Sequence, residues 1–221
     1  IWECPPNGQG VIALMLLNIM SGVDKFGDHP LSVDRIHHEI EAGRIAYRDR
    51  NLYLADPEFI DVPVDQMLSA NYAAAIRAQI NPVKAFADLP PTTLPPHKHT
   101  VYISVVDKDR NACSLINTVF HSFGAGLMTP QSGIVLQCRG QGFVVNPGHP
   151  NCIAPGKRPL HTIIPGMATK DGKTVMSFGV MGGEYQAFGH MQFLTRLLDY
   201  GMDIQQAQDL PRFFPDPFSD V

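Results

Sequence analysis

Cysteine is scarce in this sequence, and its spacing argues against the usual cysteine-based sites. The 221 residues contain four cysteines, none in a Cys-x-x-Cys pair and none with a histidine at zinc-finger spacing. We therefore expect no metal site and no cofactor. Cys4, Cys113, Cys138 and Cys152 are better explained as buried, reduced thiols, which favours a cytoplasmic protein. A periplasmic location stays open because the sequence begins at Ile1, without a methionine.

Excess basic charge and long apolar runs are also missing. The net charge is −4, only 17% of the residues are charged, and the basic residues form no patch, so we expect no nucleic-acid partner. The apolar stretch 11–20 ends at Ser21-Gly22 and falls short of the about 20 residues that span a bilayer, so we expect no membrane partner. A hydrophobic content of 44% is typical of a globular protein with a sizeable core.

The order of the expected elements predicts an α+β fold. Helices are expected first, at 8–20, after an N-cap at Ser32, and at 69–80. Strands follow, with turns at 107–111 and 170–173 that predict two hairpins, and two more helices close the chain. The strands are expected at 100–107, 112–119, 133–137, 162–169 and 174–181, and the closing helices at 186–200 and after Asp203. Helices, then hairpins, then helices indicate an antiparallel sheet.

A proline-rich segment, 89–99, separates the first helices from the first strand. It has four prolines and no periodicity, which predicts a flexible or extended linker. His97 and His99 suggest a metal site, but Lys98 lies between them and no acidic residue is near. Thr100 follows at once. In most strands such a threonine only fills a β-branched position. If the His99–Thr100 bond were cut, however, Thr100 would carry a free α-amine beside its hydroxyl, which joins a nucleophile and a base on one residue.

Six blocks occur in order along nearly the whole chain, at 5–10 (PPNGQG), 104–109 (SVVDKD), 122–126 (SFGAG), 155–160 (PGKRPL), 179–183 (GVMGG) and 199–212. Together they resemble the γ-glutamyltransferase family of N-terminal-nucleophile (Ntn) hydrolases. The similarity is greatest to its oxamate amidohydrolase branch, which belongs to purine-nitrogen catabolism. The resemblance implies a four-layer αββα sandwich with antiparallel sheets, of which this chain would form a part.

The same resemblance implies a self-cleaving precursor, or zymogen, that is longer than this chain. Residues 1–99 would be the C-terminal part of its large-subunit region and would end in the scissile linker 89–99. Residues 100–221 would be the small-subunit region, beginning at the nucleophile. The cleavage site would be the bond between His99 and Thr100. The partners would be a small-molecule amide and the remainder of the precursor.

The resemblance also assigns catalytic roles. Thr100 would be the nucleophile, and Thr118 would orient it through a hydrogen bond. Gly182 and Gly183 would form the oxyanion hole, because adjacent glycines let backbone N–H groups approach a reacting oxygen closely. Without the resemblance, a strand threonine and a flexible turn would be the ordinary interpretations.

The departures from the family pattern concern the substrate. Relatives that act on γ-glutamyl groups hold the amino-acid end with an asparagine, an aspartate and two serines. The matching positions here are Phe120, Gly142, and His161 with Thr162. A buried ammonium without a partner is costly, so γ-glutamyl recognition should be poor and a smaller acyl group without an amine should fit better.

Three further residues near these positions are candidates for the pocket or for its support. Arg139 could hold the carboxylate of the acyl group, although a solvated arginine is the simpler interpretation. Tyr185 could line the pocket or be a core or surface tyrosine. His161 could donate a hydrogen bond to the substrate, although a structural histidine is the simpler interpretation. Arg158 is expected to tie the loop at Pro159-Leu160 to a carboxylate.

The sequence therefore favours a self-processing N-terminal-threonine amidohydrolase that cleaves a small amide such as oxamate and releases ammonia. One alternative is a γ-glutamyltransferase, glutathione hydrolase or cephalosporin-acylase-like enzyme. Another is a precursor or degenerate fragment without activity, because an intact His99–Thr100 bond would keep the base tied up as an amide.

Overall fold

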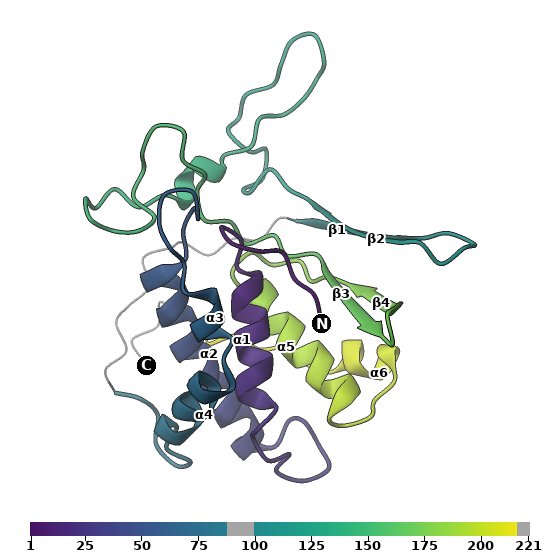
Figure 1. Ribbon diagram of the computed structural model, residues 1–221. Helices are drawn as coiled ribbons and strands as arrows, with labels where there is room; N and C mark the ends of the chain where they lie inside the picture. The colour runs from purple at the N-terminus through teal and green to yellow at the C-terminus, as the bar shows by residue number, and fades with distance from the viewer. Residues whose placement is uncertain (88–99, 216–221) are drawn as a thin grey trace. The chain divides into compact units, whose positions relative to one another are not determined.

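The computed structural model describes residues 1–87 and 100–215 (Figure 1). The predicted linker 89–99, with the cleavage residue His99, lies outside the described residues. Contacts divide the described chain into two compact units. The first unit comprises residues 1–10, 54–62 and 100–187, and the second comprises residues 11–53, 63–87 and 188–215.

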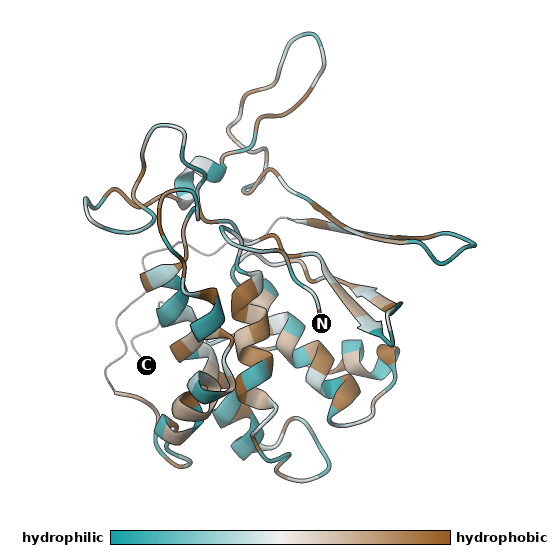
Figure 2. Ribbon diagram, in the orientation of Figure 1, coloured by the Kyte–Doolittle hydropathy of each residue, from teal (hydrophilic) through white to brown (hydrophobic). Residues whose placement is uncertain are grey.

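Most of the helical residues belong to the second unit. The helices are α1 (Gly10–Met20), α2 (Val33–Tyr53), α3 (Val64–Met67), α4 (Ala70–Gln79), α5 (Tyr185–Leu198) and α6 (Ile204–Asp209). Figure 2 shows α1 as largely apolar, and Ile12, Leu16 and Ile19 on it are completely buried. Helices whose apolar side chains all lie inside a core need no polar stripe, which explains the continuous hydrophobic run.

Side-chain caps fix the starts of three helices. The Oγ of Ser32 accepts a hydrogen bond from the N–H of Arg35 at 3.3 Å, and the Oγ of Ser69 accepts one from the N–H of Tyr72 at 3.1 Å. Asp203 and Gln206 form a capping box at the start of α6. Each cap satisfies a backbone donor that the first turn leaves unpaired, so the predicted caps at Ser32 and Asp203 are confirmed.

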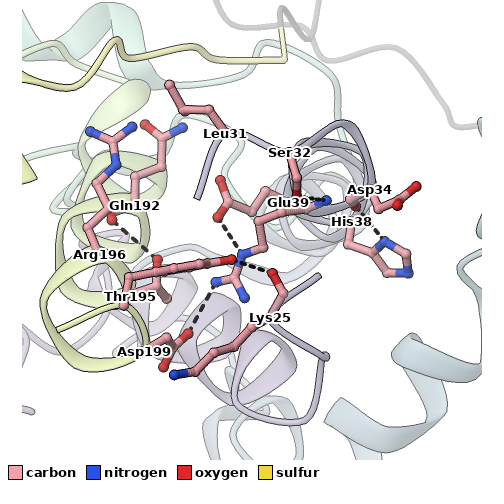
Figure 3. A network of polar contacts seen from close by, with 12 residues as sticks. Lys25, Leu31, Ser32, Asp34, His38, Glu39, Gln192, Thr195, Arg196 and Asp199 are labelled. Carbon is pink, nitrogen blue, oxygen red and sulfur yellow. Dashed lines mark hydrogen bonds and ion pairs between the residues drawn. The ribbon is translucent and has the colours of Figure 1, made fainter. Parts of the chain in front are cut away.

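A buried ionic network lies in the second unit (Figure 3). Arg35 on α2 is fully buried; its Nε pairs with Glu39 at 2.8 Å and its Nη2 with Asp199, just after α5, at 3.2 Å. Burial raises the pKa of the Glu39 carboxyl, while the charge and hydrogen bond of Arg35 oppose that rise. Because removal of one partner would leave a buried charge unpaired, this network specifies how α2 meets the end of α5.

The first unit contains two antiparallel hairpins. Strands β1 (Val101–Val106) and β2 (Ala112–Asn117) pair with each other, as do β3 (Gly166–Lys170) and β4 (Lys173–Phe178). In the first hairpin Asp107 accepts hydrogen bonds from the N–H groups of Asp109 and Asn111, both at 2.9 Å, which closes the turn. The hydroxyl of Ser114 on β2 donates to the carbonyl of Phe178 on β4 at 3.3 Å, so the two hairpins touch.

The expected elements are mostly present, with one exception. The predicted strand at 133–137 is wrong: this segment makes a single isolated bridge, between Met128 and Val135. Ile134, Val135 and Leu136 are exposed, so the apolar run that suggested a strand is not buried by a partner strand. The sequence also missed the short helix α3 and the 3₁₀ turn at Arg139–Gly142.

Two other expectations concern the burial of the cysteines and the absence of a membrane-spanning helix. All four cysteines are free, but Cys113 is exposed and the other three are only partly covered, so the expectation of burial is wrong. Among the described helices none combines the length and apolar character required for crossing a bilayer.

Candidate active site

The two predicted catalytic threonines, Thr100 and Thr118, directly flank the hairpin β1–β2 in the sequence. Val101 pairs with Asn117 as the last residues of its register, at the open end of the hairpin (Figure 1). Extending this register by one residue would bring Thr100 across from Thr118. Residues opposite one another in an antiparallel pair project to the same face, so the geometry suits a hydroxyl that orients a neighbouring hydroxyl.

Thr118 connects this end of the hairpin to Phe120. The N–H of Phe120 donates to Oγ1 of Thr118 at 3.0 Å. Phe120 is 3% exposed and has a φ of 81°, in the region that bulky residues rarely occupy. A buried aromatic held in an unfavourable backbone conformation indicates that the local packing determines its position, which is common at functional sites.

Arg139 packs on that aromatic ring. Its Cζ lies 3.8 Å from the centre of the Phe120 ring, and its Nη1 lies 3.4 Å from Oγ1 of Thr162, a weak hydrogen bond. Burial lowers the pKa of Arg139 to about 10, so the group is a cation at neutral pH. Within residues 1–87 and 100–215 no carboxylate forms an ion pair with Arg139. A partly buried guanidinium without a counter-ion is well suited to bind an anion.

His161 lies beside Arg139 but carries no charge at neutral pH. Burial, helped by the positive charges of Arg139 and Arg158, lowers the pKa of His161 to about 4, and the backbone of Ile163 offsets this only partly. Its ring packs on Gly8, where a Cβ would come within 2.5 Å of Cε1. The structure therefore favours a structural histidine, and a role in binding substrate stays a prediction.

The predicted oxyanion glycines follow β4. Gly182 has a φ of 136° and Gly183 a φ of 56°, both conformations that side-chain-bearing residues seldom adopt. The carbonyl of Gly182 accepts a hydrogen bond at 3.1 Å from the N–H of Tyr185, the first residue of α5. The backbone thus turns sharply between a strand and a helix, and Tyr185 lies next to the glycine pair.

Gly142 has a packing reason for being glycine. It is buried in the 3₁₀ turn, where a Cβ would lie 2.7 Å from the carbonyl oxygen of Leu160. Its own carbonyl accepts a hydrogen bond from the side chain of Asn151 at 2.6 Å. An aspartate at position 142 therefore fits only if the backbone near Leu160 moves. The glycine that is present leaves this position without a carboxylate.

Arg158 ties its loop to a carboxylate, as the sequence predicted. The guanidinium of Arg158 pairs with the fully buried Asp56 at 2.6 Å, and the backbone N–H of Arg158 donates to the same carboxylate at 2.8 Å. These hydrogen bonds hold the pKa of Asp56 down at about 2. The ion pair anchors the segment that leads into His161 and Thr162.

Gln9 is the site residue that the sequence did not reveal. It is completely buried, and its Nε2 donates to the carbonyl of Thr162 at 3.1 Å and to that of Gly183 at 3.0 Å. The Pro-Pro-Asn-Gly-Gln-Gly block pointed to the turn, but a single glutamine gives no sign of partners more than 150 residues away.

The contacts form one continuous series in the first unit. They run from the open end of β1–β2 to Phe120, then to Arg139 and Thr162, and through Gln9 to Gly183. No cluster of three or more His, Cys, Asp or Glu residues in the described chain is placed to hold a metal ion. Thr118, a cationic side chain and the predicted oxyanion glycines are thus linked by contacts within one unit.

Comparison with known proteins identifies the family of this chain. The profile described as gamma-glutamyltranspeptidase matches residues 1–219, almost the whole chain. The chain belongs to the γ-glutamyltranspeptidase family. The expected Ntn-hydrolase fold class is likewise confirmed by solved members of this family and related acylases. The crystal structure of a cephalosporin acylase from Bacillus halodurans superposes with a TM-score of 0.85 at 41% identity, over 96% of this chain and 38% of that one.

Curated relatives in the family have different names. A glutathione hydrolase proenzyme from Pseudomonas sp. (strain A14) is 40% identical over 95% of this chain and 39% of its own length. An oxamate amidohydrolase proenzyme from Klebsiella pneumoniae is 32% identical over 96% of this chain and 39% of its own length. The chain therefore spans about two-fifths of these family members, and its identity to the oxamate enzyme is the lower of the two.

Proposed function

We propose that the full-length protein is a self-processing amidohydrolase with an N-terminal threonine nucleophile. The observation that supports this most is the hairpin register, which ends at Val101 and Asn117 and whose extension by one residue would bring Thr100 opposite Thr118. The name proenzyme, carried by both curated relatives described above, supports a cleaved precursor. Cleavage of the His99–Thr100 bond would free the α-amine that the reaction requires.

The reaction proceeds through an acyl-enzyme. The Oγ of Thr100 attacks the amide carbonyl, while the α-amine of the same residue accepts the hydroxyl proton. The amine then returns that proton to the leaving nitrogen, which departs as ammonia. Water attacks the resulting ester, restores the hydroxyl and releases the acid. An α-amine with an ordinary pKa of about 7.7–8.0 is suited to this exchange near neutral pH.

The glycine pair stabilises the charge that develops in this reaction. Backbone N–H groups in the 182–183 turn are assigned to the tetrahedral oxyanion, and such donors act strongly because they are fixed before the reaction begins. Thr118 orients the nucleophile. Both roles rest on position in the first unit and on the family pattern.

The substrate we propose is a short amide that carries a carboxylate, with oxamate as the candidate. Arg139 is a partly buried cation without a carboxylate partner in the described chain, and Phe120 covers one face of it. A planar guanidinium recognises a carboxylate through paired hydrogen bonds. Oxamate and water would give oxalate and ammonia, as expected in purine-nitrogen catabolism and in the cytoplasm.

The alternative substrates are those of the other relatives. The higher identity to a glutathione hydrolase and to a cephalosporin acylase favours a γ-glutamyl or larger acyl group. Against the γ-glutamyl group stands the absence of a side chain at Gly142 and the apolar Phe120, which leave its ammonium without an anionic partner at these two positions.

The test combines processing with substrate choice. The wild-type full-length protein should split into two fragments by intact mass, and the new chain should begin Thr-Val-Tyr. Thr100→Ala should stay whole and inactive, whereas Thr100→Ser, which keeps a hydroxyl, should still split. Ammonia release from oxamate should exceed hydrolysis of γ-glutamyl-p-nitroanilide.

Three results would count against the proposal. Cleavage of Thr100→Ala at the same bond would show that this threonine is not needed for processing. Turnover by an unbroken chain would show that the free amine is not needed for catalysis. Activity on γ-glutamyl-p-nitroanilide alone would leave the nucleophile in place but reject the short-amide substrate.

A further inference from the structure

Gln9 joins the two segments of the site that would hold opposite ends of a substrate. One hydrogen of its side-chain amide is donated to the carbonyl of Thr162 and the other to the carbonyl of Gly183. A primary amide has two N–H donors, so both are used here. The two carbonyls are therefore held at a separation that one planar group determines.

Each of the two segments has a different task in the proposed function. Thr162 is the residue whose hydroxyl meets Arg139, at the end of the site where a carboxylate would bind. Gly183 belongs to the turn that would face the amide carbonyl. The distance between these ends sets how many carbon atoms the acyl group can have.

The backbone around Gln9 is also fixed. Its N–H donates to the carbonyl of His161 at 3.1 Å, and the N–H of His161 donates to the carbonyl of Asn7 at 3.2 Å. Gly8 between them leaves no room for a side chain against His161. Gln9 is thus anchored on the 161–162 segment by backbone bonds and reaches the glycine turn only through its side chain.

We infer that Gln9 is a positioning residue that sets the acyl length the enzyme accepts, by fixing the oxyanion turn relative to the Arg139 subsite. This inference rests on the proposed function. It goes beyond it because it assigns to Gln9 an effect exerted through the backbone carbonyls of Thr162 and Gly183. Buried amide-to-carbonyl hydrogen bonds of this kind are costly to lose when the carbonyls stay buried.

The experiment measures binding of diacids, which are the products of the proposed hydrolysis. Oxalate, malonate, succinate and glutarate are titrated into processed full-length protein by calorimetry. The wild type should prefer one length over its neighbour by about tenfold or more, the range typical of one methylene in a shaped pocket. In Gln9→Met, which keeps the length but donates no hydrogen bond, the preference should shrink to about threefold or less.

A second variant covers the case in which Gln9→Met does not fold or is not cleaved. Gln9→Glu keeps the size of the side chain, but an ionised carboxylate would repel both carbonyls. Its diacid affinity and its turnover should fall as pH rises through the titration of this glutamate, a dependence that the wild type lacks. The control is Asn18→Leu, which removes an amide donor to the carbonyl of Leu68 within the second unit, whereas the site residues belong to the first.

The outcomes separate this inference from the proposed function. An unchanged length preference in both Gln9 variants, or an equal loss of affinity for every diacid, would overturn the inference. Failure of all four diacids to bind the wild type would overturn it as well. Failure to hydrolyse any amide would reject the proposed function, and the diacid profile would still decide the role of Gln9.

Discussion

The guanidinium carbon of Arg139 lies 3.8 Å from the centre of the Phe120 ring, and Nη1 of the same group reaches Thr162. An arginine stacked on an aromatic ring keeps its edge N–H groups available for an anion in the plane of the guanidinium. The free edge of the Arg139 guanidinium is therefore suited to an anion and not to a second cation.

Replacing Arg139 should remove discrimination between charged and neutral substrates. Arg139→Met is expected to raise the KM for oxamate by about tenfold or more, because charge-assisted hydrogen bonds contribute about 1.5–3 kcal/mol. Hydrolysis of the neutral analogue oxamide should change little. Steady-state kinetics on the two amides measure the difference. An equal effect on both would mean that Arg139 supports the pocket without binding the carboxylate.

Gly183→Ala should reduce turnover more than stability. The φ of 56° costs alanine about 1–2 kcal/mol, and the resulting shift of the turn should displace an oxyanion donor, whose loss costs about 10²–10³ in kcat. Gly172→Ala is the matched control, since Gly172 has a φ of 74° in the β3–β4 turn with open space around it. Both variants should lose similar stability in thermal unfolding, and only the first should lose kcat.

His161 should give the folded protein a pH dependence at moderately acidic pH. Its pKa is about 4 in the folded chain and 6.5 as the reference value, so the unfolded chain binds a proton between these values and the folded chain does not. The free energy of unfolding should fall as pH drops from about 6.5 to 4, with a slope approaching about 1.4 kcal/mol per pH unit. Denaturant titrations across this range measure it.

The control for this prediction is another histidine. His161→Gln should flatten the slope in that window, whereas replacement of the exposed His29 by glutamine should leave it in place. If the free energy of unfolding of His161→Gln kept the same dependence on pH, a group other than His161 would be responsible for the proton uptake.

Asp56 should stabilise the first unit over a lower pH range. Its folded pKa of about 2 lies below the reference value of 3.8, so its contribution is present above 3.8 and is lost as pH falls through about 2. Asp56→Asn should lower the melting temperature by several degrees at pH 7 and by much less near pH 2. Glu58→Gln, which removes the exposed partner of the same arginine, should have almost no effect. Equal losses in the two variants would contradict a special role for Asp56.

Local patterns predicted most of the elements because their causes are local. The caps at Ser32 and Asp203 and the turn at 170–173 involve residues within a few positions of one another, and all three are confirmed. The run at 133–137 has the composition of a strand, but a strand also needs a partner along its length. That requirement is not local, and the prediction failed there.

The candidate site shows the same difference between features with local causes and features that depend on distant segments. The glycine pair and Thr100 were singled out because their types and order match a family pattern, and their catalytic roles stay predictions. The stacking of Arg139 on Phe120, and the neutrality of His161, depend on burial that arises from distant segments. Gln9 could not be predicted at all, since its two acceptors are backbone carbonyls, which every residue possesses.

The pairing of Val101 with Asn117 has a consequence for the evolution of this hairpin. A slip of one position would turn each side chain of one strand to the opposite face, because side chains alternate along a strand. The loop between Asp107 and Asn111 therefore acts as a spacer for chemistry located a full strand away, about 20 Å for six residues. An insertion in that exposed loop that shifted the register by one residue would change which residue faces Thr118.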